Sequence, residues 1–305
     1  MPDSTDHNLD THAGAPALTP PLPLSVAIIC KDNRDSIGRT LESVRGMAAQ
    51  IIAVDSGSTD GTLDILRAHG CEIHHQPWLG HVRQKQAALD LCAEPWILSL
   101  DSDESLDDEL ARAIRFAIER DDDRIDGFEV NRKVWYAGDY LHHAWQPEWR
   151  LRLVRRHKAR WTGYDPHDKL VLIEPPSAAP RTGQLEGILR HDSIPTIADF
   201  LRKQVDHART AANALSAQGQ RTTPLRLVTS PIGAYLKQLI ARRAYKDGWR
   251  GHVAAGATAA AALLKHIALL EATHSKSPPP LGRGPGGGTP NAPMTSPPAS
   301  PEPPR

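Results

Sequence analysis

The first 120 residues alternate between two spacings of hydrophobic positions. Short apolar runs, typical of buried strands, cover residues 24–30, 51–55, 71–74 and 96–100. Each run is followed by apolar residues at helical spacing, which predicts helices over 37–44, around 63–66, over 84–91 and from 105 onward. Ser36 and Ser105 are the expected starts of the first and last of these helices. Four such units in succession predict an α/β fold with a mostly parallel sheet that helices cover on both faces.

The two ends of the chain differ in composition from the middle. Residues 1–22 are acidic and lack the basic and then apolar order of a secretory signal. Residues 275–305 are dominated by Pro, Gly and Ser. Neither segment can bury enough apolar surface to fold, so both are predicted to be disordered.

An Ala-rich apolar stretch, Val253–Leu264, lies before the C-terminal tail. It is followed by Lys265 and His266 and is well short of the roughly 20 apolar residues that a transmembrane helix needs. The stretch therefore predicts a helix that is either buried or resting on a membrane surface.

The two halves of the chain carry opposite charge, although the 305 residues together have no net charge. Residues 1–130 hold 24 acidic and 11 basic side chains, whereas residues 131–305 hold 12 acidic and 25 basic ones. A basic second half indicates an anionic partner, and nucleic acid, phospholipid and phosphorylated glycan all fit this charge. Three cysteines without zinc-site spacing predict reduced thiols in a cytosolic protein.

The apolar strand at 96–100 ends abruptly in the acidic segment Asp101-Ser102-Asp103-Glu104. In an extended chain, residues two apart point to the same side, so Asp101 and Asp103 can face one cation. Carboxylates favour Mg2+ or Mn2+, which in turn bind phosphates, and this pattern indicates an enzyme that handles a nucleotide. The alternative is a pair of acids in a solvated loop or a helix cap.

A second polar segment, Val54–Thr62, follows the strand at 51–55 and contains two glycines with several hydroxyl and carboxylate side chains. Asp55 and Asp101 both stand at the carboxyl ends of predicted parallel strands, which is where such sheets bind ligands. Taken alone, the segment also fits a plain turn with a helix N-cap.

These two segments together resemble the family 2 glycosyltransferases, inverting enzymes of the GT-A fold that use nucleotide sugars. The similarity extends to the first strand, 24–31, and to Trp78, Gly80, Gln84, Lys85, Ala88 and Leu89. Within the family the chain is most similar to the branch that adds sugars, often as beta-glucosyltransferases, to the lipopolysaccharide inner core. Residues 152–156, 165–170 and 245–251 agree with this branch. One departure is Lys31-Asp32-Asn33, where the first strand of the family commonly ends Lys-Asn-Glu.

The resemblance implies roles for several residues in donor binding. The nucleotide sugar would be bound by Lys31, Asp55, Ser56, Lys85 and Asp101. Asp103, together with Asp101, would hold Mg2+ or Mn2+. For Lys85 the alternative is a solvated lysine on a helix surface.

Inverting transfer requires a carboxylate that removes the proton of the acceptor hydroxyl while its oxygen attacks the anomeric carbon. The related branch carries a His-Glu pair at the position of His167-Asp168. The resemblance therefore implies Asp168 as the catalytic base, with His167 orienting it or binding acceptor phosphate. The alternatives are a surface ion pair between Asp168 and Lys169, and a purely structural histidine.

Basic residues cluster in two later segments. In the first, Arg152, Arg155 and Arg156 are expected to bind acceptor phosphates, because guanidinium groups match phosphate oxygens. A solvated outer face is the alternative. The second set, Lys237, Arg242, Arg243, Lys246 and Arg250, flanks apolar residues. It fits a helix on anionic lipid, and equally a basic helix packed on the catalytic domain.

The predicted organisation has four parts: a disordered extension, 1–22; a nucleotide-sugar-binding catalytic domain, 23–174; a helical acceptor-side region that associates with a membrane, 175–274; and a disordered tail, 275–305. The expected function is transfer of a hexose, from UDP-glucose, to lipopolysaccharide core or a related glycolipid. The expected location is the bacterial cytoplasm, peripherally on the inner membrane, with no nucleic-acid partner. The alternatives are an aspartate-dependent phosphohydrolase and a noncatalytic glycolipid-binding protein.

Overall fold

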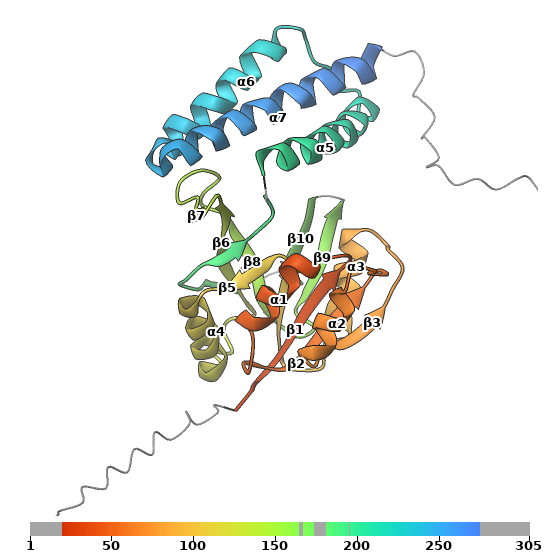
Figure 1. Cartoon of the computed structure of the whole chain (residues 1–305), viewed down its shortest axis with the longest axis vertical. Coiled ribbons are helices and arrows are strands. Elements are labelled where there is room, and N and C mark those ends of the chain that lie inside the picture. Colours follow the sequence, from red (N-terminus) through yellow and green to blue (C-terminus); the bar gives the residue numbers. More distant parts are fainter. Residues whose placement is uncertain (1–19, 165–166, 174–180, 195, 275–305) are drawn as a thin grey trace, which may run out of the picture.

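The computed structural model describes residues 20–164, 167–173, 181–194 and 196–274, without the side chains of Tyr164 and His167. A 10-stranded sheet forms the body of the molecule, and a layer of three long helices lies over one of its edges (Figure 1). The segments predicted to be disordered, 1–22 and 275–305, lie outside the described residues except for 20–22, and Leu22 begins the first strand.

Four parallel strands form one half of the sheet, in the order β3-β2-β1-β4. Their bounds are β1 Leu22–Cys30, β2 Ala48–Asp55, β3 Glu72–His75 and β4 Trp96–Asp101. Strand β1 pairs with both β2 and β4, so Cys30 lies beside Asp55 and Ile29 lies beside Asp101. The carboxyl ends of these strands therefore bring both predicted acidic segments to the same edge of the sheet, on either side of β1.

Beyond β4 the sheet becomes mixed. Strand β8 (Trp149–Arg155) pairs antiparallel with β4 and with β6 (Gly127–Tyr136), and the path continues through β12 (Leu189–His191) to β5 (Glu104–Leu106). The remaining strands are β7 (Asp139–Tyr140) and β11 (Thr182–Gln184), which pair with β6, and the separate antiparallel pair β9 (Ala159–Tyr164) and β10 (His167–Leu172).

This architecture confirms the predicted fold class, an α/β protein with a helical C-terminal region. The sheet continues past residue 174, the predicted end of the catalytic domain, because β11 and β12 both pair with β6. The predicted division into domains stays a prediction.

Helices cover both faces of the parallel strands. Helices α1 (Arg34–Ser43), α2 (Thr62–Ala68) and α4 (Asp108–Arg120) pack on one face, and α3 (His81–Asp90) packs on the other together with β9 and β10. The alternation of strand side chains produces these two cores, since Val26 and Ile28 join the first and Ala27 joins the second. Each fully buried Val or Ile contributes about 1.5–3 kcal/mol to folding.

Two predicted helix starts are wrong by two or three residues. Helix α1 begins at Arg34, so Ser36 lies within its first turn and Asn33 is the N-cap residue. Helix α4 begins at Asp108, because Ser105 pairs with β12 as part of β5. Its cap is Asp107, whose carboxylate accepts a hydrogen bond of 2.8 Å from the amide of Leu110.

The helical layer follows the sheet in sequence. It contains α5 (Ile197–Ala217), α6 (Arg226–Leu236), a π-helical turn η1 (Lys237–Ala241), a short 3-10 helix η2 (Ala244–Asp247) and α7 (Gly248–His274). Helices α5 and α6 both pack along α7 (Figure 1).

The apolar helix is longer than the sequence predicted. Within the described residues, the helix Ala244–His274 contains an 18-residue window with a mean hydropathy of 1.7 and is long and apolar enough to cross a membrane. The expectation from Val253–Leu264 alone was too short, because Ile267, Leu269 and Leu270 continue the apolar composition past Lys265. A helix in the core of a soluble protein meets the same criterion but is mostly buried, whereas 22% of this window is buried, although α5 and α6 pack along α7.

The segment 244–251 fastens the helical layer to the hairpin of β6 and β7. The carboxylate of Asp247 accepts hydrogen bonds from three consecutive backbone amides, those of His142, His143 and Ala144, at 3.2, 3.0 and 2.7 Å. It also lies 2.8 Å from Nδ1 of His143. A side chain at Gly251 would place its Cβ 1.7 Å from the carbonyl oxygen of Ala244, so only glycine fits there. We call the contact between Asp247 and the amides of His142, His143 and Ala144, together with the close approach at Gly251, the clasp.

Candidate active site

A buried lysine joins two carboxylates at the end of β4. Lys85, on α3, is 7% exposed, and its Nζ lies 2.6 Å from Oδ1 of Asp101 and 2.8 Å from Oδ2 of Asp168. The same nitrogen lies 4.6 Å from the centre of the Trp161 ring. The alternative of a solvated lysine is therefore wrong. Among the described ion pairs, Asp168 has Lys85 as its partner and not its neighbour Lys169.

Two arginines extend this network behind Asp101. Nη2 of Arg152, on β8, lies 3.1 Å from Oδ2 of Asp101 and 2.7 Å from Oε1 of Glu104. Arg132, on β6, lies 3.2 Å from the same oxygen of Glu104 and 2.7 Å from Oε1 of Glu148. Glu104 is fully buried, and its other oxygen accepts a hydrogen bond of 3.1 Å from the backbone amide of Asp101.

The network keeps two buried acids ionised. Burial by itself would raise the pKa of Asp101, but Lys85 and then Arg152 hold that pKa well below its ordinary range. Burial likewise opposes ionisation of Glu104, and Arg152 is the main cause that lowers the pKa of this acid. Both carboxylates are thus already neutralised by basic side chains.

Asp103 differs from its neighbours. In the described part of the chain no Lys or Arg lies within 4.0 Å of its carboxylate, and its charged contact is Nε2 of His191 at 3.6 Å. Burial raises the pKa of Asp103; His191 opposes this shift, whereas the carboxylates of Asp101 and Glu104 add to it. Strand β4 ends at Asp101 and the chain turns at Asp103, so the expected extended pair is not formed. Both acids nevertheless line the same cleft.

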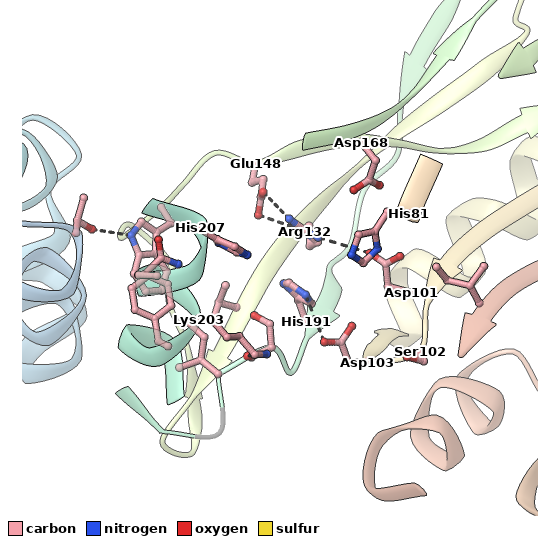
Figure 2. A pocket seen from close by; sticks show the side chains of 18 of the residues that line it. His81, Asp101, Ser102, Asp103, Arg132, Glu148, Asp168, His191, Lys203 and His207 are labelled. Atoms are coloured by element: carbon pink, nitrogen blue, oxygen red, sulfur yellow. Dashed lines mark hydrogen bonds and ion pairs between the residues drawn. The ribbon is translucent and has the colours of Figure 1, made fainter. Parts of the chain in front are cut away.

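The cleft has a volume of about 1360 Å3 and lies between the end of the sheet and the helical layer. Figure 2 shows Asp101, Asp103 and Asp168 on the sheet side, with Lys203 and His207 of α5 across from them. Pockets for one drug-sized ligand are usually about 300–1,000 Å3, so this cleft has room for two substrates.

A second cavity, of about 490 Å3, continues from the cleft along β8. The residues that line both spaces are Lys85, Asp101, Arg132 and Asp168. Trp161 lines the second cavity, and Trp145 lines the cleft, where its ring stacks on that of Phe200 at 5.4 Å.

Some of the predicted donor-binding residues do not face the cleft. Lys31 lines it, but Asp55 and Ser56 line neither cavity. The carboxylate of Asp55 is 3% exposed and accepts hydrogen bonds from the amides of Gly57, at 2.8 Å, and Ser58, at 3.1 Å. Burial opposes its ionisation, but the bonds from Ser58 and Gly57 lower its pKa. Asp55 thus stabilises its own turn, and its role in donor binding stays a prediction.

The structure does not bring Arg155 and Arg156 to the cleft. Strand β8 runs antiparallel to β4, so Arg155 pairs with Trp96 at the opposite end of β4 from Asp101. Nη1 of Arg155 lies 2.8 Å from Asp121, and its guanidinium lies 4.4 Å from the centre of the Trp96 ring. Arg156 is exposed beside it. Of the three arginines predicted to bind the acceptor, only Arg152 lines a described cavity.

The second member of the predicted catalytic pair, His167, belongs to β10, but its side chain lies outside the described part of the structure. Asp168 points toward the cleft (Figure 2), and its side chain is 14% exposed.

Sequence reasoning missed four residues of the site. They are Glu104, Arg132, Glu148 and His191. Glu104 belongs to the acidic segment and could have been included on that ground. The other three approach through pairing between distant parts of the chain, for which the local sequence carries no signal.

The donor set at Asp101 and Asp103 fits a divalent cation that arrives with a nucleotide. Among the described side chains, no group of three or more His, Cys, Asp or Glu is arranged to hold a metal. Mg2+ is commonly bound by one or two carboxylates together with phosphates of the substrate, which requires no preformed cage. In the described part of the chain Asp103 has no Lys or Arg within 4.0 Å, so its carboxylate is not already bound by such a side chain and is the better placed of the two to ligate a cation.

Comparisons with known proteins show the family of the chain. Residues 25–171 match the model of the family described as Glycosyl transferase family 2. The chain is 29% identical over 271 residues to the lipopolysaccharide core biosynthesis glycosyltransferase LpsC of Rhizobium meliloti, covering 86% of this chain and 97% of the relative. It is also 29% identical to an uncharacterised glycosyltransferase of Rickettsia prowazekii, with 75% and 80% covered.

Among solved structures, the chain is similar to mannosyl-3-phosphoglycerate synthase from Rubrobacter xylanophilus, with a TM-score of 0.44, 16% identity and coverage of 67% of this chain and 78% of that one. The segment that matches the family model, 25–171, spans most of β1 to β10. It contains both acidic segments, and it also contains Lys85 and Asp168. The chain therefore belongs to glycosyltransferase family 2 and is an enzyme of that family.

Proposed function

We propose that this enzyme is an inverting hexosyltransferase that moves a hexose, with UDP-glucose as the expected donor, to lipopolysaccharide core or a related glycolipid. The observation that carries the proposal is the convergence of Asp101, Asp103 and Asp168 on one cleft large enough for two substrates. The similarity to LpsC, whose name states lipopolysaccharide core biosynthesis, supports the choice of acceptor.

In this proposal Asp168 is the base. Its carboxylate takes the proton of the acceptor hydroxyl, the freed oxygen bonds to the anomeric carbon, and the bond from that carbon to the diphosphate breaks. Lys85 holds Asp168 beside Asp101 and balances the charge of both acids. Asp103 and Asp101 would hold Mg2+ or Mn2+, which when bound neutralises charge on the departing diphosphate.

The test is release of nucleoside diphosphate by purified protein with manganese, a nucleotide sugar and a lipopolysaccharide core acceptor. Asp168→Asn should lower kcat by about 10²- to 10⁴-fold, the usual contribution of a general base. Asp103→Asn should abolish activity, and added manganese should not restore it. A matched control is Asp64→Asn, because Asp64 is 81% exposed on α2. Full activity of Asp103→Asn after chelation would contradict the metal assignment.

The aspartyl-phosphate alternative is less well supported. The segment that contains Asp101 matches the glycosyltransferase family model, which covers residues 25–171.

We also propose a peripheral membrane location, on the cytoplasmic face of the inner membrane. Helix α6 and the turn after it present an exposed apolar stripe, formed by Leu225, Val228, Ile232, Leu236 and Ile240. Residues 207–246 contain seven Lys or Arg and no Asp or Glu, so the surroundings of this stripe complement an anionic lipid surface.

Sedimentation with vesicles tests the membrane proposal. The protein should bind vesicles that contain phosphatidylglycerol more strongly than neutral vesicles, and Ile232→Glu should weaken that binding. Phe116→Glu is the control, because Phe116 is 65% exposed on the distant helix α4. Equal binding of Ile232→Glu and of the unaltered protein would argue against the stripe as the docking surface.

A further inference from the structure

Among the described residues, none of those that line the helical side of the cleft is acidic. Its lining residues are Phe200, Lys203, Gln204, His207, Ala234, Lys237, Gln238, Arg242 and Thr258. We call this surface the roof and its Lys203, Lys237 and Arg242 the roof cations. They come from α5 and from the π-helical turn that follows α6, and Figure 2 shows Lys203 facing the acids of the sheet.

The roof cations form no close ion pair in the described part of the chain, although Lys203 interacts at longer range with Asp199 of the same helix, which is paired with Arg202. Among the described residues, no carboxylate lies within 4.0 Å of any of them. Lys203 contacts a backbone oxygen, that of Ser193, at 3.5 Å, and Arg242 donates to the backbone oxygen of Gln146. The basic residues on the sheet side differ, because Lys85, Arg132 and Arg152 each bind carboxylates. Lys31, after β1, also lines the sheet side without an ion pair among the described residues, so unpaired positive charge is concentrated on the roof, which has three such residues, but is not confined to it.

A buried donor lies among the roof cations. Gln238, in η1, is 5% exposed, and its side-chain nitrogen has no hydrogen-bond partner in the described structure. A buried amide of this kind is costly unless a ligand or water accepts its hydrogen bond. Turns of π-helix are frequent at functional sites, since they turn side chains into positions that a regular helix does not offer.

We propose that the roof is a binding site for an anionic group, a phosphate or carboxylate, carried by the acceptor. The inference rests on the proposed function. The donor diphosphate is expected at Asp103 with its metal, on the sheet side, which leaves the roof to the second substrate. The cleft volume accommodates both, and the acceptor sugar would then lie between the roof and Asp168.

Charge reversal tests the roof with an acceptor in solution, so that no membrane takes part. The probe is deacylated lipopolysaccharide core oligosaccharide in its phosphorylated form and after chemical dephosphorylation. Lys237→Glu and Lys203→Glu should each raise the KM for the phosphorylated acceptor about tenfold, which corresponds to about 1.4 kcal/mol. The KM for the donor should stay unchanged. The matched control is Arg209→Glu, because Arg209 is an exposed residue of α5 that does not line the cleft.

Dephosphorylation and calorimetry separate the possible outcomes. If phosphate is the recognised group, the unaltered enzyme should bind the dephosphorylated probe as weakly as the Glu variants bind the phosphorylated one. If the acceptor KM of the variants exceeds that of the unaltered enzyme by the same factor with both probes, the roof binds the carboxylates of the acceptor instead. An unchanged acceptor KM in both variants, an equal change in Arg209→Glu, or a raised donor KM would each overturn the proposal. Binding of phosphatidylglycerol vesicles without binding of the oligosaccharide would also overturn it, because the roof would then be a lipid site.

Direct binding keeps this test independent of turnover. If the oligosaccharide binds the roof by calorimetry and Lys237→Glu abolishes binding, but no nucleotide sugar is ever consumed, the proposed function fails and the roof stands. If transfer occurs with a normal acceptor KM in the variants, the roof fails and the proposed function stands.

Discussion

Replacement of Asp247 by alanine should undock the helical layer from the sheet. The carboxylate is 3% exposed and accepts bonds from three backbone amides and from the ring of His143. Hydrogen bonds to a charged group contribute roughly 1.5–3 kcal/mol each, although water will reach part of the opened loop. We therefore expect a loss of about 3 kcal/mol or more, comparable with the breaking of a buried ion pair.

A loss of that size is easily measured by thermal unfolding. For a chain of 305 residues, an unfolding entropy of about 2.1 cal/mol/K per residue means that 1 kcal/mol corresponds to about 1.6 °C, so Tm should fall by about 5 °C. Asp139→Ala is the control, because Asp139 lies near the same joint, 4.0 Å from Arg250, with a side chain that is 54% exposed. A Tm for Asp247→Ala equal to that of Asp139→Ala would refute the reasoning.

The acid dependence gives a second check on the clasp. Burial opposes ionisation of Asp247, but the amide of Ala144 and then His143 hold its pKa below the ordinary value of an aspartate. Stability from a lowered pKa is complete above the pKa of the unfolded chain and is lost as pH falls through the native pKa. The difference in Tm between Asp247→Ala and the unaltered protein should therefore be constant near pH 7 and shrink in acid. A Tm difference between the two proteins that grows in acid would contradict this role of the Asp247 carboxylate.

Two further variants test other positions. Gly251→Ala should lower Tm at least as much as Asp247→Ala, because its Cβ would collide with the backbone of Ala244; an unchanged Tm would show that the joint can yield. Arg155→Ala should leave the acceptor KM unchanged and lower Tm by a few degrees, since Arg155 stabilises the far end of the sheet through Asp121, the carbonyl of Ile125 and the Trp96 ring. A rise in acceptor KM without a change in Tm would restore Arg155 to the acceptor site.

The fold could be predicted well where the information is local. The apolar runs at 24–30 and 96–100 became β1 and β4, because a strand buried on both faces needs continuous apolar sequence. The boundary of α4 was missed because Ser105 resembles a helix cap, yet its backbone pairs with β12, more than eighty residues later. Local capping signals cannot reveal such a pairing.

The site was predictable only in part for the same reason. The acids at 101 and 103 follow directly from the end of a strand, and both line the cleft. The basic cluster around 152–156 was misread, because sequence does not show that β8 runs antiparallel to β4. Three residues along a strand cover about 10 Å, which is enough to separate Arg155 from the cleft that Arg152 approaches. Lys237 and Arg242 were noticed in the sequence for their charge and Lys203 was not; only the packing of α5 and η1 shows that these three residues line the cleft.

The clasp has a consequence for protein engineering. Exchange of the C-terminal helices between related enzymes is an obvious route to new acceptor preferences. A chimera joined near residue 195 would combine the loop 141–147 of one enzyme with the C-terminal helices of another. The three loop amides that donate to Asp247 would then meet a different segment. Functional hybrids should therefore require that the β6–β7 hairpin, the loop after it and the C-terminal helices are all taken from the same enzyme.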